Sequence, residues 1–499
     1  MTLFSDPQKT FAVITTGLVV IAIVHKWQRS KSLPLPPGPR EVLSYSLLPK
    51  SYSFAQLEEF TQQYGPVFSL RQGFKTMIVV GRVQAAIDIM EKQGAATPDR
   101  PKNTPIGEIL SGGMRTFLMP NGERLRKTRR ALHAYLQPKK IVEYGPVLMA
   151  RAKQHILSVL DDPSNHQQHA KLYTDSVIMF LMYGITPERY DDPYITAVNG
   201  CLQRLGENMT PGKWKVDTFP FLQYIPGYFD ELRQGHAEEL AVFGNLLRQV
   251  KERLARGEVV PDCFIRYMLE NQEELELSDD EAAYLAGTMF GAGTAGSISV
   301  GVMAAASYPN AQRKVQEELD RVIGERAPTA ADLNMLPQLN AYVLEILRWR
   351  PVTADASLFP HRTIKEIIWQ NYRIPKDTTI IGSFWSIGKD PDFFPDPEKF
   401  DPQRWINKDG KIKDDLKSFS FGFGRRVCSG QHLANTSMLL NMALLLWTFT
   451  IKEDPSSPID KMALESCFAT LLLPFNVVFE PRAAKTADGI RELFNDYAL

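Results

Sequence analysis

A single cysteine stands in the glycine-rich stretch FGFGRRVCSG at residues 421–430. The glycines of this stretch permit positive φ and a close approach of the backbone, so the loop can fold tightly beneath a flat group. The residues after Cys428 have the apolar pattern of a long helix, which places the sulfur near a helix N-terminus. Free N–H groups and the helix dipole stabilise a thiolate there. The sequence therefore predicts a thiolate at Cys428.

A thiolate on such a loop, with an arginine nearby to pair carboxylates, suits axial ligation of haem iron. The alternative is a buried structural cysteine in a glycine-rich turn, which a lone Cys-x-Gly would favour. The full string F-x-x-G-x-R-x-C-x-G is more specific, because at average residue frequencies it arises by accident once in ~10⁴ chains of this size. The string therefore favours the iron ligand.

The segments that must position this cysteine are mostly helical. In residues 308–324, YPNAQRKVQEELDRVIG, a proline opens the predicted helix, an apolar stripe runs along it and Gly324 ends it. Residues 54–65 and 83–94 are also predicted as helices, with a β-hairpin over 67–81 between them. Residues 364–384 have the pattern of short strands and turns. The prediction is a mainly α fold with a small β portion, in one catalytic domain.

Composition excludes several classes of protein. Lysine plus arginine equals aspartate plus glutamate, 57 each, so bulk charge indicates no nucleic-acid partner. The four cysteines are far apart and form no CxxC pair, which argues against a disulfide framework or a Cys-rich zinc site. This cysteine usage is typical of a reducing compartment.

The N-terminal segment is far more apolar than a soluble protein of this composition would suggest. Residues 11–24, FAVITTGLVVIAIV, are apolar apart from two threonines, and extended to Trp27 they reach the low end of a membrane-spanning length. Four basic residues follow, on the side that the positive-inside rule keeps in the cytosol: Lys26, Arg29, Lys31 and Arg40. The alternative, a cleaved signal peptide, lacks an A-x-A site. Residues 1–31 are therefore predicted as a membrane anchor with its flank, and residues 32–40 as a stiff proline-rich linker.

Five residues of the cysteine loop match the haem-binding loop of the cytochrome P450 superfamily: Phe421, Gly424, Arg426, Cys428 and Gly430. The chain resembles this superfamily over essentially its whole length, and its microsomal, fungal-like branch best. The resemblance implies the cytochrome P450 fold for residues 41–499 and haem b as the cofactor, contacted by this loop. It implies that Cys428 is the proximal iron ligand, that Arg426 pairs a haem propionate and that Phe421 packs beside the sulfur.

Two further stretches agree with the superfamily. Glu345 and Arg348 lie at i,i+3 on one helix face, where an ordinary ion pair contributes about 0.2–0.5 kcal/mol. The resemblance implies that this is the E-x-x-R pair of the superfamily, completed by Arg404 into a buried charge cluster that supports the haem-side core. It also implies that His361 in LFPHR pairs a propionate. The alternative for His361 is a solvated histidine at a strand end.

Residues 121–136, NGERLRKTRRALHAYL, resemble the superfamily's helix with the pattern W-x-x-x-R. Arg129 matches the arginine that reaches a propionate, but Leu125 stands where a tryptophan is usual, so one propionate donor is missing. The remaining basic residues form either a solvated helix face or a docking patch for an acidic electron donor: Arg124, Arg126, Lys127 and Arg130.

The sequence departs from the superfamily at residues 287–299, GTMFGAGTAGSIS, which resemble the long helix that crosses above the haem. The usual string is close to A-G-x-D-T-T, but here Ala295 replaces the acid, Gly296 replaces the threonine and Ser297 follows. Small residues leave space for dioxygen and a substrate, or else permit close helix packing. Glycines at 293 and 296 cost about 1 kcal/mol each relative to alanine in a regular helix, which suggests a local opening.

This departure affects the chemistry, because cleavage of the O–O bond needs protons placed on the distal oxygen, normally through an alcohol and ordered water. Ser297 lies one residue further on, roughly 100° around the helix, and can serve only if the helix is distorted there. We hypothesise that a substrate hydroxyl or amide, or a water in the space at Gly296, supplies the relay. The predicted catalytic-site residues are therefore Gly293, Gly296 and Ser297.

The resemblance also suggests which residues face the substrate, although each could equally belong to the core: Ile109, Leu110, Met114, Phe290, Ala356, Leu358 and Phe468 to Leu471. They imply a largely apolar pocket for a hydrophobic small molecule. Residues 216–229, VDTFPFLQYIPGYF, form either a surface loop that dips into a membrane near a substrate entrance or a buried core loop.

The combined prediction is a haem-thiolate monooxygenase held in the endoplasmic reticulum membrane by a single span, with its catalytic domain facing the cytosol. It would use O2 and electrons from NADPH-cytochrome P450 reductase to hydroxylate or epoxidise a lipophilic small molecule, such as a fungal secondary metabolite. One alternative is oxidative coupling, ring closure or rearrangement on the same haem, with no oxygen kept in the product. The other is a non-catalytic haem-binding protein, against which the Glu345–Arg348 pair and the predicted anchor argue.

Overall fold

The computed structural model describes residues 33–41, 48, 53–73, 75–210, 212–217, 219–290, 294–354, 359–466 and 470–495. The predicted anchor at residues 1–31 lies outside this part of the chain, within which no helix is long and apolar enough to cross a membrane. The described part of the proline-rich linker lies against the folded domain: Pro37 O accepts from Ser69 N (2.7 Å) and Pro34 O from Arg373 N (2.9 Å).

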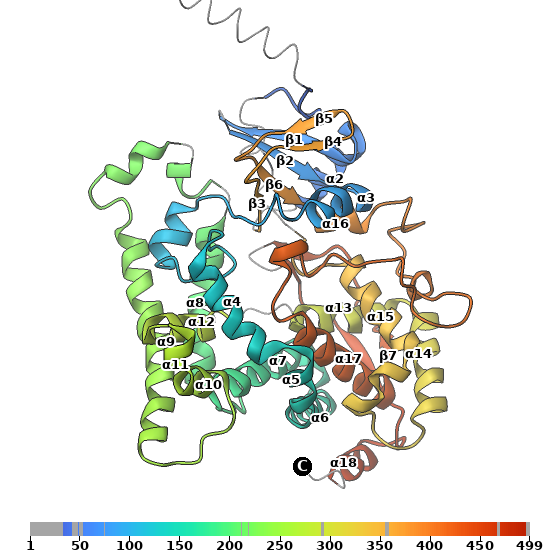
Figure 1. The fold of residues 1–499 in the computed structure, drawn as a ribbon. Coiled ribbons are helices and arrows are strands. Elements are labelled where there is room, and N and C mark those ends of the chain that lie inside the picture. The colour runs from blue at the N-terminus through green and yellow to red at the C-terminus, as the bar shows by residue number, and fades with distance from the viewer. Residues whose placement is uncertain are drawn as a thin grey trace, which may run out of the picture.

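A small β-rich part lies at one end of the molecule, above a large helical body in Figure 1. Its four-stranded sheet has the order β1–β2–β6–β3, formed by β1 (Val67–Gln72), β2 (Lys75–Val80), β6 (Thr379–Gly382) and β3 (His361–Arg362). The predicted hairpin is confirmed as the antiparallel β1–β2 pair. β6 runs parallel to β2, so residues about 300 positions apart in the sequence form one sheet.

The predicted helices on either side of this hairpin are confirmed with one difference. α2 (Ser53–Tyr64) ends at Gly65, whose φ of 101° only glycine adopts readily. The second helix begins as α3 (Val83–Ala86) and continues as a π-helix over Ile87–Lys92. A π-helix is the wider of the two forms and is often found at functional sites; here it contacts the short helix that precedes Cys428.

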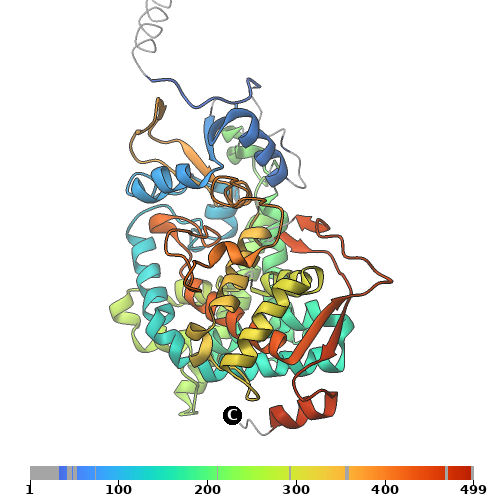
Figure 2. The ribbon, with the colours of Figure 1, turned by 90° about the vertical axis from the view of Figure 1, so that its right-hand side faces the viewer.

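The remaining elements confirm a mainly α fold with a small β portion. The helices of the body and their neighbours are α4 (Glu123–Leu136), α5 (Pro138–Glu143), α6 (Gly145–Asp161), α7 (His166–Tyr183), α8 (Pro193–Met209), α9 (Asp230–Ala255), α10 (Phe264–Glu270), α11 (Gln272–Leu275), α12 (Asp279–Gly287), α13 (Thr294–Ser307), α14 (Pro309–Val322), α15 (Pro337–Trp349), α16 (Phe384–Gly388), α17 (Gln431–Thr448) and α18 (Ala487–Asn495). Three two-stranded ribbons pair β4 (Ile367–Trp369) with β5 (Tyr372–Ile374), β7 (Phe449–Glu453) with β10 (Val477–Pro481), and β8 (Leu464–Ser466) with β9 (Thr470–Leu472). Figure 2 shows the β7–β10 ribbon on a different side of the body from the first sheet.

The core is built around two helices that are buried on nearly all sides, α13 and α17. In α13 every residue from Gly296 to Ala306 is buried, and in α17 every residue from Leu440 to Thr448 is buried. Such a helix must be covered all round, and both contact α15, α14 and each other in the centre of the body. α14 shows the opposite, amphipathic case: Val315 and Leu319 face the core, and Gly324 (φ 70°) follows its end as predicted.

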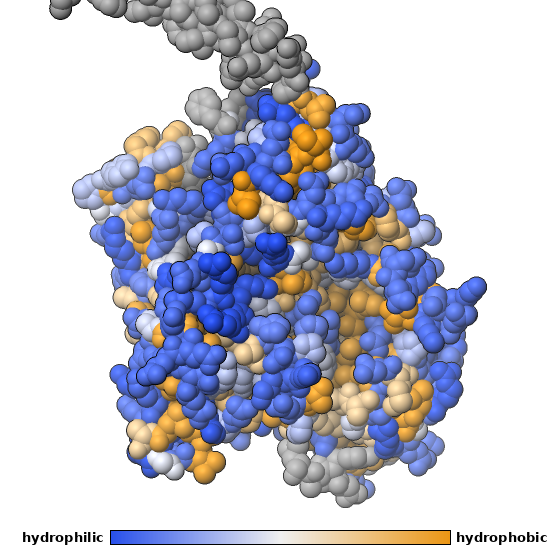
Figure 3. All heavy atoms as spheres, in the orientation of Figure 1, coloured by the Kyte–Doolittle hydropathy of each residue, from blue (hydrophilic) through white to orange (hydrophobic). Residues whose placement is uncertain are grey.

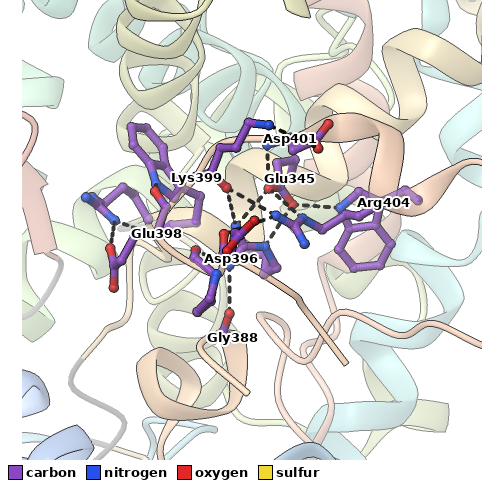
Figure 4. Close-up of polar contacts among 12 residues, drawn as sticks. Glu345, Gly388, Asp396, Glu398, Lys399, Asp401 and Arg404 are labelled. Carbon is purple, nitrogen blue, oxygen red and sulfur yellow. Dashed lines mark hydrogen bonds and ion pairs between the residues drawn. The ribbon is translucent and has the colours of Figure 1, made fainter. Parts of the chain in front are cut away.

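The predicted charge cluster around Glu345 is confirmed, and Figure 4 shows it. The carboxylate of Glu345 is fully buried and accepts from Arg348 Nε (2.8 Å) and Nη2 (2.7 Å) and from Arg404 Nε (3.0 Å). Trp405 Nε1 (2.9 Å) and the Asp401 backbone N–H (2.9 Å) also donate to it. One carboxylate therefore joins α15 to the chain near residues 401–405.

Candidate active site

The predicted helix-end position of Cys428 is confirmed. The loop passes through a 3₁₀ turn at Gly424–Arg426, and Gly430 is the N-cap of α17, two residues after the cysteine. The Cys428 N–H donates to Phe421 O (2.8 Å), which closes the loop below a large internal cavity. The accessible surface of Cys428 faces this cavity, so the side chain is open on one side although it lies deep in the protein.

Two of the three loop glycines have the backbone conformation that the sequence suggests. Gly422 has φ 87° and Gly424 has φ 49°, and a Cβ on Gly424 would lie 2.7 Å from Met90 O. The Gly424 N–H also donates to the carboxylate of Glu91 in the π-helix (2.9 Å). Gly430 instead has φ −92°, which any residue adopts. Gly430 lines the cavity beside the sulfur, and a Cβ there would lie 3.9 Å from Cys428 Sγ, an ordinary contact distance.

The surroundings of the sulfur raise the pKa of its thiol. Burial raises the pKa of the Cys428 thiol, and the Gly430 N–H and the positive charge of Arg129 oppose this increase. The helix end alone therefore does not give the thiolate that the sequence predicts. A bound metal ion deprotonates a coordinating thiol outright, so the chemistry of this donor fits an iron ligand.

A cluster of three arginines and one histidine lines the same cavity. The predicted residues Arg129, Arg426 and His361 are all brought together there, and Arg100 joins them. Among the described residues, none of the three guanidinium groups forms an ion pair with a carboxylate; their hydrogen bonds go to backbone oxygens instead. Arg426 donates to Pro98 O and Met119 O (both 2.7 Å), Arg129 to Val427 O (3.2 Å) and Arg100 to Pro360 O (2.7 Å).

We call this group the cationic cluster (Arg100, Arg129, Arg426 and His361). Burial and the charges of Arg426 and Arg129 lower the pKa of Arg100 to about 9, although the nearby charge of Asp99 opposes this decrease. Its Nε is buried without a hydrogen-bond partner among the described residues. Burying charge without a counter-charge is costly. A haem presents two carboxylate groups, so the residues present fit the cofactor that the resemblance implies.

His361 occupies its predicted position, but its charge state differs from that of the arginines. Its Nδ1 lies 2.8 Å from Thr97 O, so Nδ1 carries the proton and donates to this carbonyl. Burial and the neighbouring charges of Arg100 and Arg426 lower the pKa of His361 to about 3, which leaves the ring neutral. A neutral ring has no second N–H, so His361 can donate to a carboxylate only after it gains a proton.

Replacing Arg100 by methionine is expected to speed haem release by about tenfold, because a hydrogen bond to a charged group contributes about 1.5–3 kcal/mol. The free energy of unfolding of the haem-free protein should stay the same or rise, since a buried charge without a partner is removed. Transfer of haem to an excess of an apo-globin measures the release rate. Arg425→Met is the control, because Arg425 is the exposed neighbour of Arg426. Equal release rates in both variants would contradict a contact between Arg100 and the cofactor.

The helix above the sulfur is interrupted, as the glycines suggested. α12 ends at Gly287 and α13 begins at Thr294, and the predicted residue Gly293 lies outside the described residues. Ser297 is buried and lines the cavity, and Thr294 lines it one turn earlier. Gly296 is buried within α13 and is not part of the described lining. The interruption lies before Thr294, whereas Ser297 stands in the unbroken part of α13 and reaches the cavity without a distortion of the helix at its own position. Thr294 is a second alcohol that the sequence did not single out.

The residues predicted to face the substrate have three different outcomes. Phe290 lines the cavity as predicted, next to Met289. Ile109, Leu110 and Met114 are not part of the described lining, because the π-helix at Thr104–Leu110 packs its apolar side chains against α9 and Met114 belongs to the main core. Ala356, Leu358 and Phe468 lie outside the described residues. Other apolar residues line the wall above the sulfur: Phe117, Leu132, Leu202, Leu205 and Phe359.

The basic face of α4 is partly neutralised. Arg124 forms an ion pair with Glu281 (2.9 Å) and Lys127 with Glu276, whereas Arg126 and Arg130 are exposed and form none among the described residues. Figure 3 shows hydrophilic atoms over α4. α4 lies beside the cysteine loop, since Arg129, one helical turn after Arg126, donates to Val427 O.

The loop at residues 216–229 lies at the surface rather than in the core. Four large apolar residues are strongly exposed: Phe219, Phe221, Tyr224 and Ile225. Tyr224 is 80% exposed, whereas Val216 and Phe229 at the two ends of the loop are buried. The ends therefore anchor an apolar tip that faces solvent.

Comparison with known proteins agrees with this geometry. A sequence profile of the family described as Cytochrome P450 matches residues 34–479. The chain is 48% identical over 493 residues to Cytochrome P450 monooxygenase 113 of Postia placenta, covering 97% of this chain and 99% of that protein. It is 46% identical over 478 residues to Cytochrome P450 monooxygenase 88 of the same fungus, covering 94% of this chain and 96% of that protein. A cytochrome P450 monooxygenase of Armillaria gallica is 31% identical over 493 residues, covering 94% of each chain.

Proposed function

Because the chain belongs to the cytochrome P450 family and is a monooxygenase, we propose that it hydroxylates or epoxidises a lipophilic small molecule of secondary metabolism. The observation that carries this proposal is the composition of the cavity lining, which includes Phe117, Leu202, Leu205, Met289 and Phe290. Apolar side chains at that position favour a ligand with a large apolar body.

The proposed roles of the residues follow from their places in the cavity. Cys428 would ligate the iron of a haem b, and the cationic cluster would hold its propionates. When bound, a thiolate-ligated haem would supply the activation of dioxygen, since the sulfur donates electron density that favours O–O cleavage. The hydroxyls of Thr294 and Ser297 hold and transfer protons at the α13 end of the cavity. The apolar wall excludes bulk water and orients the substrate.

We propose that electrons come from NADPH-cytochrome P450 reductase, docked beside α4 and the cysteine loop. Arg126, Arg130 and Arg425 are exposed in this region and would attract an acidic partner surface. Residues 1–31 would anchor the protein in the endoplasmic reticulum membrane with the catalytic domain in the cytosol. The exposed tip Phe219–Ile225 would touch the same membrane, since aromatic residues favour the membrane–water interface.

A second candidate function is oxidative coupling, ring closure or rearrangement with no oxygen kept in the product. The observation that favours it is the replacement of the usual acid and threonine by Ala295 and Gly296. Turnover under ¹⁸O-labelled dioxygen separates the two, because only hydroxylation or epoxidation puts the label into the product.

The proposed function is tested first by the absorption spectrum of the reduced, carbon monoxide-bound protein, which reports a thiolate-ligated haem. Lipophilic metabolites are then screened for a shift of the haem absorption band and for product formation with the reductase and NADPH. Binding and turnover of apolar metabolites are expected. Turnover restricted to strongly polar molecules, or failure of the reductase to support it, would overturn the proposal.

Replacing Ser297 by alanine is expected to lower the product formed per NADPH by at least about tenfold and to raise hydrogen peroxide release correspondingly, because a proton donor beside the reacting oxygen is lost. Peroxide and product are measured against NADPH consumption. Ser299→Ala is the control: Ser299 is buried in the same helix, but its hydroxyl donates to Ala295 O (3.0 Å).

Equal coupling in both serine variants would mean that Ser297 is not the relay. It would favour the hypothesis that a substrate group or a water at Gly296 supplies the protons. Gly296→Thr should then change peroxide release where Ser297→Ala does not.

A further inference from the structure

Arg115 is an almost fully buried cation in the wall of the cavity, on elements different from those that carry the cationic cluster. Its side chain is 1% exposed, and it follows the π-helix Thr104–Leu110. Its Nη2 lies 2.7 Å from the carboxylate of Glu239 on α9, and its Nε donates to Ser111 Oγ (3.1 Å). The Tyr284 hydroxyl on α12 donates to the same oxygen of Glu239. Three separate segments therefore meet at one buried ion pair.

The cluster lies next to the apolar wall above the sulfur. Tyr284 is one helical turn before Thr288, which lines the cavity and is followed by Met289 and Phe290. Arg115 itself lines the cavity together with its neighbour Phe117. Nε and Nη2 are bound to protein groups, whereas no hydrogen bond from Nη1 is found among the described residues. Nη1 is also not one of the side-chain nitrogens that are buried without a hydrogen-bond partner in the described part of the chain. It is therefore the guanidinium nitrogen that remains to face the cavity.

We propose that Arg115 Nη1 binds an uncharged oxygen of the substrate, a carbonyl or hydroxyl on an otherwise apolar skeleton, and so positions the skeleton above the haem. This inference rests on the proposed lipophilic-substrate function and narrows its substrate class. Arg115 is a positioning residue in this role.

The negative charge of Glu239 is the reason that the bound oxygen is expected to be uncharged. The carboxylate is fully buried and already neutralises Arg115, so a substrate carboxylate would bring a second negative charge into the same site. The other oxygen of Glu239 is also buried and has no hydrogen-bond partner among the described residues. The site therefore has no spare positive charge for an acid. A neutral acceptor takes the N–H of Nη1 without disturbing the charge balance.

The test compares ligands that differ in one group. Cyclododecane, cyclododecanone and cyclododecanecarboxylic acid share one skeleton, as do 5α-androstane, 5α-androstan-3-one and the corresponding 3-carboxylic acid. Each is titrated against the full-length holoenzyme, with binding followed by equilibrium dialysis and by the haem absorption band. In each series the ketone is expected to bind about tenfold more tightly than the hydrocarbon, because it accepts a hydrogen bond from a charged donor. The acid is expected to bind less tightly than the ketone.

Arg115→Lys is the informative variant. Lysine keeps a positive charge beside Glu239 but has no planar fork that can bind a carboxylate and a ligand together. The preference for the ketone should fall to about twofold or less, while the affinity for the hydrocarbon stays the same. Arg313→Lys is the matched control, since Arg313 forms an exposed pair with Glu317 on α14. If Arg115→Lys does not fold, the double variant Arg115→Met/Glu239→Met removes both charges at once and should lose the same preference.

The outcomes separate this inference from the proposed function. If ketones and hydrocarbons bind equally well to the unaltered protein, or if Arg115→Lys weakens both alike, the assignment of Arg115 is wrong and the apolar pocket stands. If acids bind more tightly than ketones, the proposal that Arg115 binds an uncharged oxygen is wrong. If no ligand of either skeleton binds, the proposed lipophilic-substrate function fails, and the role of Arg115 fails with it.

Discussion

Replacing Cys428 by serine is expected to reduce monooxygenase activity to background and to abolish the thiolate-type spectrum of the carbon monoxide complex. A serine oxygen is not deprotonated by this environment and does not donate electron density to iron as sulfur does. The fold should persist, because the side chain of Cys428 faces the cavity and packs little against other residues. The free energy of unfolding of the haem-free protein should change by no more than about 0.5 kcal/mol.

The matched control for this variant is Cys263→Ala, since Cys263 is fully buried in the core away from the cavity. It should keep the thiolate-type spectrum even though it loses some stability. A Cys428→Ser protein that retains this spectrum and its activity would show that another residue ligates the iron, and the candidate active site would have to be abandoned.

Replacing Glu345 by glutamine is expected to lower the free energy of unfolding by about 3–5 kcal/mol, because two arginines lose their counter-charge in the interior. Arg348 and Arg404 have side chains that are 1% and 8% exposed. Arg348 also donates to Gly388 O (2.7 Å) and Pro397 O (2.9 Å), so it holds the segment before the cysteine loop. Since single domains are stable by about 5–15 kcal/mol, this loss is a large share of the total stability.

Haem content should fall together with stability in this variant. α15 carries Glu345 and also Leu347, whose backbone oxygen accepts a hydrogen bond from Ser420 Oγ (2.8 Å). Ser420 stands directly before the cysteine loop. Denaturant unfolding and the ratio of haem to protein measure the two effects. Glu317→Gln removes the exposed partner of Arg313 and should cost less than about 0.5 kcal/mol. Similar losses in both variants would mean that the Glu345 cluster is no more important than a surface ion pair.

The residues that could be predicted from the sequence are those whose relation to one another is local. Cys428 stands a few residues from the glycines that shape its loop, and Glu345 and Arg348 share a helix face by their spacing alone. The hairpin of β1 and β2 follows from two short runs rich in apolar residues, VFSLRQ and KTMIVV, each followed by a glycine. Such patterns specify geometry within one element, and the structure reproduces them.

Arg100 and Arg115 could not be found in this way. Both follow irregular segments, and only contacts with distant chain, Phe359 and Pro360 for Arg100 and Glu239 for Arg115, decide that they face the cavity. For the same reason the sequence left open whether Ile109 and Leu110 face the substrate or belong to the core. Contacts between their π-helix and α9 decide for the core. Thr294 was overlooked because the break in the helix sets which residues of α13 face the cavity.

The cysteine loop forms hydrogen bonds with residues that are synthesised much earlier. These bonds affect when the protein can take up its pigment. Gly424 bonds Glu91 across 333 positions and Arg426 bonds Pro98 across 328. Contacts of such separation form late, because a long stretch of chain must be ordered before they do. Most of the chain precedes Cys428 in synthesis. Incorporation of the pigment would therefore follow the closing of this loop, and the amount incorporated would report how many molecules have closed it.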